Sequence, residues 1–293
     1  MMSARILFFI AELALTACAP PPAPIATPSP SATIPLVTPT PLATFTPTAT
    51  IIPTITPTPT AFVTPPASGQ SANIPILMYH NLKELPHTAS ELERTWTVAP
   101  QNFEKQIAWL AEKKFNAITM AQLVTHFKRN QPLPSKPIVI SFDDGWIEQY
   151  TVAFAILKKN NLSGTFFIYT NPIDRTRYLS WAQIKEMSAA RMDIQAHTLT
   201  HPHLTALAPG DAQREIAESK RIIESKLNQP VVAFAYPFGE YNSVTIEMLK
   251  RAGFESAVTL ASGYHQRADE LFTLHRIRVS YDDSLDDFAK RLP

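Results

Sequence analysis

The sequence predicts an α/β fold built on parallel strands, because short apolar runs alternate with amphipathic stretches from about residue 73 to the end of the chain. Some of the runs, such as residues 231–236, are apolar without interruption, which is typical of a sheet covered on both faces. We expect a deformed or incomplete (β/α) barrel, with an open doubly wound sheet as the alternative. The expected strands are residues 74–80, 115–119, 137–142, 164–170, 192–197, 231–237, 256–260 and 275–280.

The stretches between these runs have helical periodicity. In residues 100–115 the side chains of Phe103, Ile107 and Leu110 fall on one face, as in an amphipathic helix. Ser180 is a typical N-cap for a helix over 180–187. The two other expected helices are residues 210–228 and 242–253. Helices between parallel strands require right-handed crossovers.

The first 18 residues have the plan of a secretory signal, with Arg5, then a short apolar run, then small residues. The run is too short to span a bilayer. Residues 15–18, "LTAC", resemble a bacterial lipobox, which implies cleavage before Cys18 and its lipidation. An ordinary signal peptide is the alternative, and Glu12 within the apolar run favours it. We expect a protein that is secreted across the membrane and lipid-anchored at the extracellular face or cell envelope.

Residues 19–72 are rich in Pro and Thr, have almost no charge and show no helical or strand period. Such a segment favours extended polyproline II structure and works as a semi-rigid spacer. We predict a tether, with featureless disorder as the alternative, followed by a folded domain over 73–293. The net charge of +1 argues against a nucleic-acid partner, and we expect a monomer.

Polar residues follow several of the expected strands. In parallel α/β folds the carboxyl ends of the strands form the ligand site, so these residues should converge on one rim. They are His80, Asp143, Asp144, His197, Tyr236, Pro237 and Phe238.

His197 and His201 lie four residues apart, and Pro202 disfavours a helix there. Two histidines on a short loop can bind one divalent metal ion, and a carboxylate as third ligand leaves a position for water. Asp144 is our candidate for that ligand. The alternative is a pair of surface histidines without a metal.

Residues 141–145 ("SFDDG") and 197–201 ("HTLTH") resemble the first two motifs of the polysaccharide deacetylases, the NodB-type enzymes of carbohydrate esterase family 4. The stretches "IPILMYHNL", "YLSWAQIKEM", "FAYPFGEYN" and "LHRIRV" resemble the surface-polysaccharide branch, which includes deacetylases of poly-β-1,6-N-acetylglucosamine. The resemblance covers nearly all of residues 73–293. It implies a metal-dependent hydrolase that removes N-acetyl groups from GlcNAc residues of an extracellular or cell-wall polysaccharide.

The resemblance also implies roles for residues. Asp144, His197 and His201 would hold the metal ion, with Zn²⁺ the first expectation and Co, Ni or Fe the alternatives. Asp143 would be the general base. Pro237 and Phe238 would bind substrate, Phe238 through its backbone at the oxyanion and acetyl pocket. Trp181 either lines the sugar groove or packs in the core.

Two histidines compete for the general acid. The branch is circularly permuted relative to other members, so the acid's place falls to His80 rather than His275 in "LHRIRV". One departure concerns Asp143, because Ala235 stands where the family has an arginine that pairs with the catalytic aspartate. The orienting charge for Asp143 is then either absent or supplied from elsewhere, with Lys185 and Arg276 as the candidates. We interpret His203 as a bystander.

Other functions stay open on the sequence alone. An O-acetyl (xylan-type) esterase would use the same chemistry, and peptidoglycan or chitin oligomers could be the substrate. A catalytically inactive carbohydrate-binding surface protein is the alternative from another class. The set of Asp143, Asp144, His197 and His201 argues against it, because sugar binding requires no metal-activated water.

Overall fold

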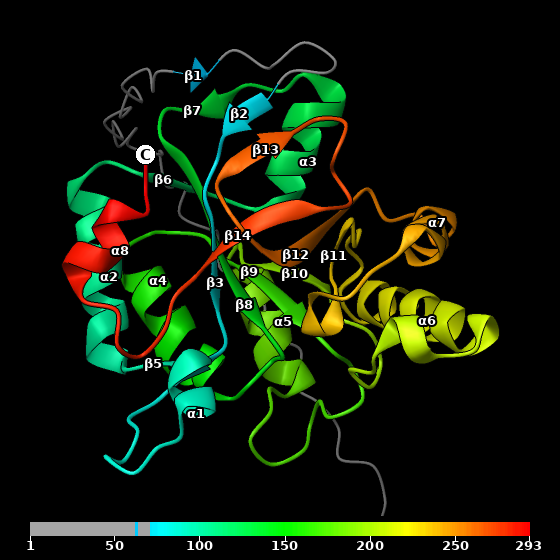
Figure 1. Ribbon diagram of the computed structural model, residues 1–293, viewed down its shortest axis with the longest axis horizontal. Helices are drawn as coiled ribbons and strands as arrows, with labels where there is room; N and C mark the ends of the chain where they lie inside the picture. The colour runs from blue at the N-terminus through cyan, green and yellow to red at the C-terminus, as the bar shows by residue number, and fades with distance from the viewer. Residues whose placement is uncertain (1–61, 64–70) are drawn as a thin grey trace, which may run out of the picture. The chain divides into compact units, whose positions relative to one another are not determined.

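A computed structural model describes residues 62–63 and 71–293 of the chain (Figure 1). All eight expected strands are present and form one sheet in which every pairing is parallel. They are β3 (Ile76–Tyr79), β6 (Asn116–Ile118), β8 (Pro137–Asp143), β9 (Thr165–Ile168), β10 (Asp193–Ala196), β11 (Ala233–Ala235), β12 (Ser256–Ser262) and β14 (Leu274–Arg278).

The sheet closes into a ring of seven strands, because β3 pairs with β14 on one edge and with β8 on the other. The order around the ring is β3, β14, β12, β11, β10, β9 and β8. The eighth strand, β6, pairs with the first half of β8, whereas β9 pairs with its second half. The deformed barrel is therefore confirmed, and the open doubly wound sheet is excluded.

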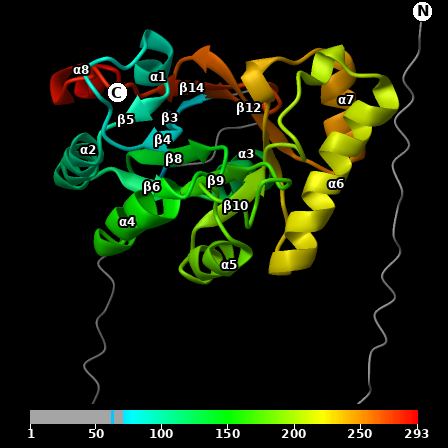
Figure 2. The ribbon, with the colours of Figure 1, turned by 90° about the horizontal axis from the view of Figure 1, so that it is seen from below.

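Helices surround the strands (Figures 1 and 2). The four predicted helices are confirmed as α2 (Pro100–Glu112), α5 (Trp181–Ala189), α6 (Pro209–Leu227) and α7 (Ser243–Arg251). Ser180 caps α5 as expected, in a capping box with Gln183. The helices not predicted are α1 (Glu91–Thr95), α3 (Met120–Arg129), α4 (Ala155–Lys159), which follows a π-helical turn over Gln149–Phe154, and α8 (Leu285–Lys290).

The barrel has a buried apolar end. A cluster of buried side chains gathers residues from six of the ring strands, including Ile76, Val139 and Phe167. Met120 and Leu123 of α3 belong to the same cluster and are fully buried. Helix α3 therefore covers the end at which the strands begin, and the polar chemistry is left to the opposite end.

Two short strands precede the ring. Strand β2 (Ser71–Asn73) pairs with β13 (His265–Arg267), and β1 (Phe62–Val63) pairs with β7 (Leu133–Pro134). The fold thus includes residues that we expected to belong to the 19–72 spacer, because the backbone of these short segments finds strand partners. The expected signal peptide, and the rest of the spacer, lie outside the described residues. Among the helices of the described ranges, none has the length and apolar character needed to cross a bilayer.

Candidate metal centre and active site

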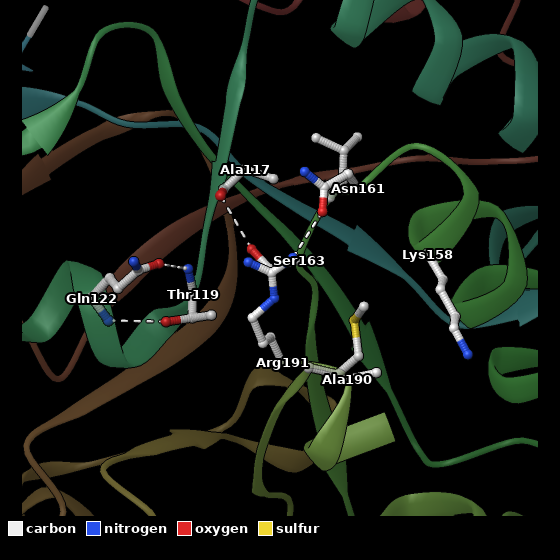
Figure 3. Close-up of a pocket in the computed structure, with 10 residues that line it drawn as sticks. Ala117, Thr119, Gln122, Lys158, Asn161, Ser163, Ala190 and Arg191 are labelled. Carbon is white, nitrogen blue, oxygen red and sulfur yellow. Dashed lines mark hydrogen bonds between the residues drawn. The ribbon is translucent and has the colours of Figure 1, made fainter. Parts of the chain in front are cut away.

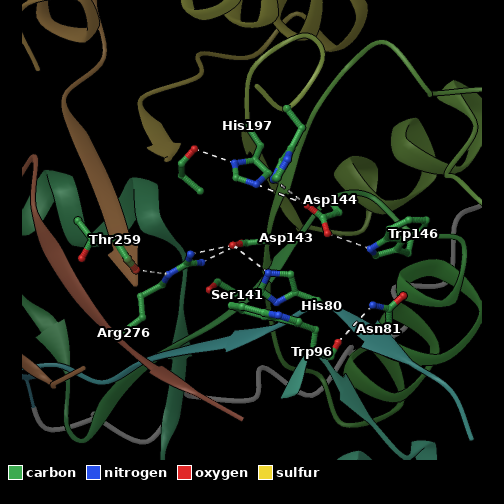
Figure 4. A network of polar contacts seen from close by, with 12 residues as sticks. His80, Asn81, Trp96, Ser141, Asp143, Asp144, Trp146, His197, Thr259 and Arg276 are labelled. Atoms are coloured by element: carbon green, nitrogen blue, oxygen red, sulfur yellow. Dashed lines mark hydrogen bonds and ion pairs between the residues drawn. The ribbon is translucent and has the colours of Figure 1, made fainter. Parts of the chain in front are cut away.

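One pocket of about 510 Å³ opens where the ring strands end. The expected convergence of polar strand ends is therefore found, and Figure 4 shows its central residues. The pocket is lined by His80, Asn81, Leu92, Trp96, Asp143, Asp144, His197, His201, Tyr236, Phe238 and Leu260.

Asp144, His197 and His201 form a cluster that could hold a metal ion, with candidate ligand atoms within 4.8 Å of one another. Asp144 Oδ1 lies 3.5 Å from His197 Nε2 and 3.6 Å from His201 Nε2. Asp144 and Gly145 have φ values of 82° and 76°, so the chain turns sharply after β8. This turn sends the two adjacent carboxylates in different directions.

The surroundings of the cluster fit a cation. Asp144 Oδ1 is buried and has no hydrogen-bond partner among the described residues. Buried polar atoms are rarely left without a partner, and a bound cation would supply one here. His197 Nδ1 donates to the carbonyl of Ala235 at 2.7 Å, so its Nε2 is free to act as a ligand. Burial and the neighbouring His197 lower the pKa of His201 to about 4, which keeps this imidazole neutral near pH 7.

Asp143 forms a buried, bidentate ion pair with Arg276 (Figure 4). The Arg276 nitrogens lie 2.8 and 2.7 Å from the two carboxylate oxygens, and Arg276 Nε donates to the carbonyl of Thr259 at 3.0 Å. Burial alone would raise the pKa of Asp143, but the Arg276 charge and its hydrogen bonds bring it below the ordinary value. Of the two candidates for the missing arginine, Arg276 is the partner, whereas Lys185 is exposed on α5.

His80, directly after β3, is the histidine beside Asp143. Its Nε2 lies 3.8 Å from Asp143 Oδ2, and its ring packs on Trp96 with ring centroids 4.5 Å apart. Burial lowers the pKa of His80. The side-chain amide of Gln149 donates to the backbone carbonyls of both His80 and Asp143, which ties the two strand ends together.

His275 does not line this pocket. Successive side chains of a strand point to opposite faces. Because Arg276 points inward to Asp143, the adjacent His275 of β14 points outward, where its ring lies beside Gly263.

The turn after β11 contributes Phe238, which has a φ of 57° and is 48% exposed. The centroid of its ring lies 4.7 Å from that of the His201 ring, and the ring stacks on His203 with centroids 3.9 Å apart. His203 Nδ1 in turn contacts Glu240 at 3.0 Å. His203 is thus more than a bystander, since its ring stacks on that of Phe238. Pro237, which we expected to bind substrate, is buried and does not line the pocket.

Trp181 does not reach the pocket. It packs against the core from α5, with the Lys226 amino group 5.7 Å from its ring centroid. The core-packing alternative therefore describes it better than the sugar groove. Trp96 and Leu92 line the pocket instead. They belong to a segment that has neither an expected strand nor a stretch resembling the family.

A second cavity, of about 290 Å³, lies near the beginnings of β9 and β10 (Figure 3). Except for Lys158, which faces Glu186, its polar side chains pair with one another or with the backbone. Arg191 donates to Asn161 at 2.7 Å, and Ser163 donates to the Ala117 carbonyl at 3.1 Å. Within the described part of the chain, no carboxylate or histidine lines this cavity, so we assign the chemistry to the pocket at the strand ends.

Comparisons with known proteins agree with this geometry. The sequence profile of the polysaccharide deacetylase family matches residues 130–257. YxkH of Bacillus subtilis (strain 168), assigned by its name to the polysaccharide deacetylases, is 30% identical over 209 residues, which are 71% of this chain and 72% of the relative. The Streptococcus pyogenes deacetylase PplD, solved with acetate, has a TM-score of 0.71 and 28% identity, over 76% of this chain and all of PplD.

A further relative is the poly-β-1,6-N-acetyl-D-glucosamine N-deacetylase of Escherichia coli (strain K12). It is 25% identical over 259 residues, which cover 74% of this chain but only 38% of the E. coli protein. The extent of the match to YxkH, the profile and the fold together decide the family. The chain belongs to the polysaccharide deacetylases, the NodB-type family of carbohydrate esterase family 4.

Proposed function

We propose that the chain is a metal-dependent hydrolase that removes N-acetyl groups from GlcNAc residues of an extracellular or cell-wall polysaccharide. The observation that carries the proposal is that one pocket contains both the Asp144–His197–His201 cluster and an Arg276-held Asp143 beside His80. The name of the E. coli relative supports a β-1,6-linked GlcNAc polymer as the first substrate to test.

Asp144 Oδ1, His197 Nε2 and His201 Nε2 would hold the metal ion. Two imidazoles and one carboxylate suit Zn²⁺, and Co²⁺, Ni²⁺ or Fe²⁺ are the alternatives. When bound, such an ion polarises a carbonyl oxygen and lowers the pKa of a water towards about 7.

Asp143 would act as the general base. Arg276 keeps it ionised, and it lies next to the cluster, so it would accept a proton from the attacking water as the water oxygen bonds to the acetamide carbon. His80 would deliver a proton to the nitrogen as the C–N bond breaks. The products are acetate and a free amine on the sugar.

The turn at Pro237–Gly239 would contribute to the acetyl site. Phe238, Tyr236 and Leu260 line one part of the pocket with apolar surface suited to a methyl group. The backbone N–H of Phe238 is our candidate for hydrogen bonding to the oxygen that gains negative charge.

We also propose that the protein works at the cell envelope, lipid-anchored through Cys18, with the Pro/Thr-rich segment as a tether. The support is the sequence alone. Detergent-phase partitioning of the protein expressed in a bacterial host tests it. Wild type should enter the detergent phase and Cys18→Ser should stay in the aqueous phase, whereas equal partitioning would contradict the anchor.

The enzymatic proposal is tested by measuring acetate and free amine released from a panel of acetylated glycans: β-1,6-linked GlcNAc oligomers, chitin oligomers, peptidoglycan fragments and acetylxylan. We expect release from GlcNAc oligomers, loss of release in Asp143→Asn, and wild-type release in Lys185→Ala, which changes an exposed charge outside the site. Release from acetylxylan alone would indicate an ester substrate. No release from any glycan would favour a carbohydrate-binding protein.

A further inference from the structure

Three aromatic side chains outside the pocket lining connect Asp144 to His201. They are Trp146, Tyr178 and Tyr169. Trp146 Nε1 donates to Asp144 Oδ2 at 3.0 Å (Figure 4), and the Trp146 ring stacks on Tyr178 with centroids 4.5 Å apart. The hydroxyl of Tyr169 donates to that of Tyr178 at 2.7 Å, and the Tyr169 ring lies 5.4 Å from the ring of His201. The contacts thus run from one candidate ligand to another.

The backbone ties the same parts together. The loop between β9 and α5, residues 169–180, is hydrogen-bonded on one side to the turn that carries Asp144 and on the other to the loop that carries His201. These bonds are Leu179 N–H to Gly145 O (2.9 Å), Ile147 N–H to Arg177 O (2.9 Å), Thr170 N–H to Thr198 O (3.2 Å) and Asn171 N–H to Leu199 O (2.8 Å). The loop is therefore placed to fix the separation of the two ligands.

Trp146 also decides which oxygen of Asp144 is available. Its N–H occupies Oδ2, so Oδ1, which is buried and has no hydrogen-bond partner among the described residues, is the oxygen that faces both histidines. Trp146, Tyr178 and Tyr169 do not line the pocket. Trp146 and Tyr169 therefore contact the ligands, and Tyr178 links the two, without lining the space where substrate would bind.

We propose that Trp146 is a positioning residue of the metal centre, supported by Tyr178 and Tyr169, which presents Asp144 as a ligand through one oxygen and sets its distance from His201. This inference rests on the metal site of the proposed function. Hydrogen bonds to ligating carboxylates affect metal affinity because they fix the orientation of the ligand.

The test is metal binding by the full chain, with Zn²⁺ affinity measured by competition with a chromophoric chelator and the visible spectrum recorded with Co²⁺. Trp146→Phe keeps an aromatic ring but removes the N–H. We expect it to bind Zn²⁺ roughly 10- to 100-fold more weakly than wild type and to change the Co²⁺ spectrum. Trp181→Phe is the matched control, because this half-buried tryptophan lies outside the pocket, and it should bind both metals as wild type does.

Wild-type affinity together with a wild-type Co²⁺ spectrum in Trp146→Phe would overturn the proposal. If circular dichroism shows that this variant does not fold, Tyr178→Phe decides, since it keeps the stacked ring and loses only the hydroxyl bonded to Tyr169. A weaker site there supports the proposal, and an unchanged one contradicts it. A wild-type protein that binds metal but releases no acetate would refute the proposed function and leave this inference standing.

Discussion

Arg276 compensates for the absence of an arginine at position 235. It comes from β14, whereas Ala235 is on β11, and its guanidinium is fully buried against Asp143. A buried ion pair is sensitive to the loss of one partner, because the other charge is then buried alone. The arginine therefore bears on both the stability of the barrel and the ionisation of Asp143, the proposed general base.

Arg276→Met should destabilise the metal-free protein at pH 7 by about 3–5 kcal/mol, measured by urea unfolding. In wild type the lowered pKa of Asp143 adds stability that is present above the ordinary aspartate pKa of about 3.9 and is lost as pH falls further. In the variant, burial raises that pKa, so acidification relieves the penalty. The difference between the unfolding free energies of the two proteins should therefore become smaller as pH falls.

Arg278→Met is the control for this substitution, since Arg278 is on the same strand but exposed. It should leave the unfolding midpoint nearly unchanged. Equal stability of Arg276→Met and wild type at pH 7 would show that the ion pair does not support the fold.

His80 and His275 can be separated by their pH–rate profiles. His80→Ala should lower the rate of acetate release by about 10²- to 10⁴-fold, the usual contribution of a general acid, and should remove one limb of the profile. His275→Ala should keep the wild-type profile, because His275 lies outside the pocket. Loss of turnover in His275→Ala alone would make our assignment wrong.

At this scale the sequence predicted which residues would meet, but not every contact. The motifs placed Asp143, Asp144, His197 and His201 together, because strand ends converge in a parallel fold. The choice between Lys185 and Arg276 depended on a contact across 133 positions of the chain. No local pattern determines such a contact, and only the alternation of β14 within a closed barrel decides it.

At the scale of elements, the turn Pro237–Gly239 holds Phe238 at the pocket. Gly239 has a φ of 70°, and a Cβ there would lie 2.6 Å from the Leu260 side chain and 3.0 Å from its backbone nitrogen. The turn therefore requires glycine for both its conformation and its close approach to β12.

Gly239→Ala should destabilise the protein by roughly 1–3 kcal/mol and reduce acetate release, because the turn must shift and carry Phe238 with it. Gly210→Ala is the matched control, since a Cβ at this α6 position meets nothing within 4 Å. The control should be neutral or stabilising, by about 0.4–1 kcal/mol. If thermal unfolding and activity of the two variants are alike, the packing of the turn against Leu260 does not matter.

Elements were predictable where a pattern is local. Continuous apolar runs identified the strands, and Ser180 identified the start of α5. Helix α3 was missed although its signal is local, since Thr119 and Gln122 form a capping box and Met120, Leu123 and Phe127 share one face. Leu92 and Trp96 were missed for another reason, because only tertiary structure brings them to the pocket.

At the scale of the whole molecule, β3 closes the ring by pairing with β8 and β14, and it brings His80 to Asp143. Alternating strands and helices predicted parallel topology. The pattern did not separate a closed barrel from an open sheet, because closure depends on both edges of one short strand finding partners far along the chain. The site therefore draws on residues from His80 to Arg276, which come from strands around the whole ring.

The central claim is that this pocket hydrolyses acetamides with a metal ion held by Asp144, His197 and His201. The most direct measurement is acetate release from GlcNAc oligomers by chelator-treated protein during titration with Zn²⁺. We predict negligible release before metal is added, a rise that saturates at one ion per chain, and no recovery in His197→Ala. Undiminished release after chelation, or full recovery in His197→Ala, would contradict the claim.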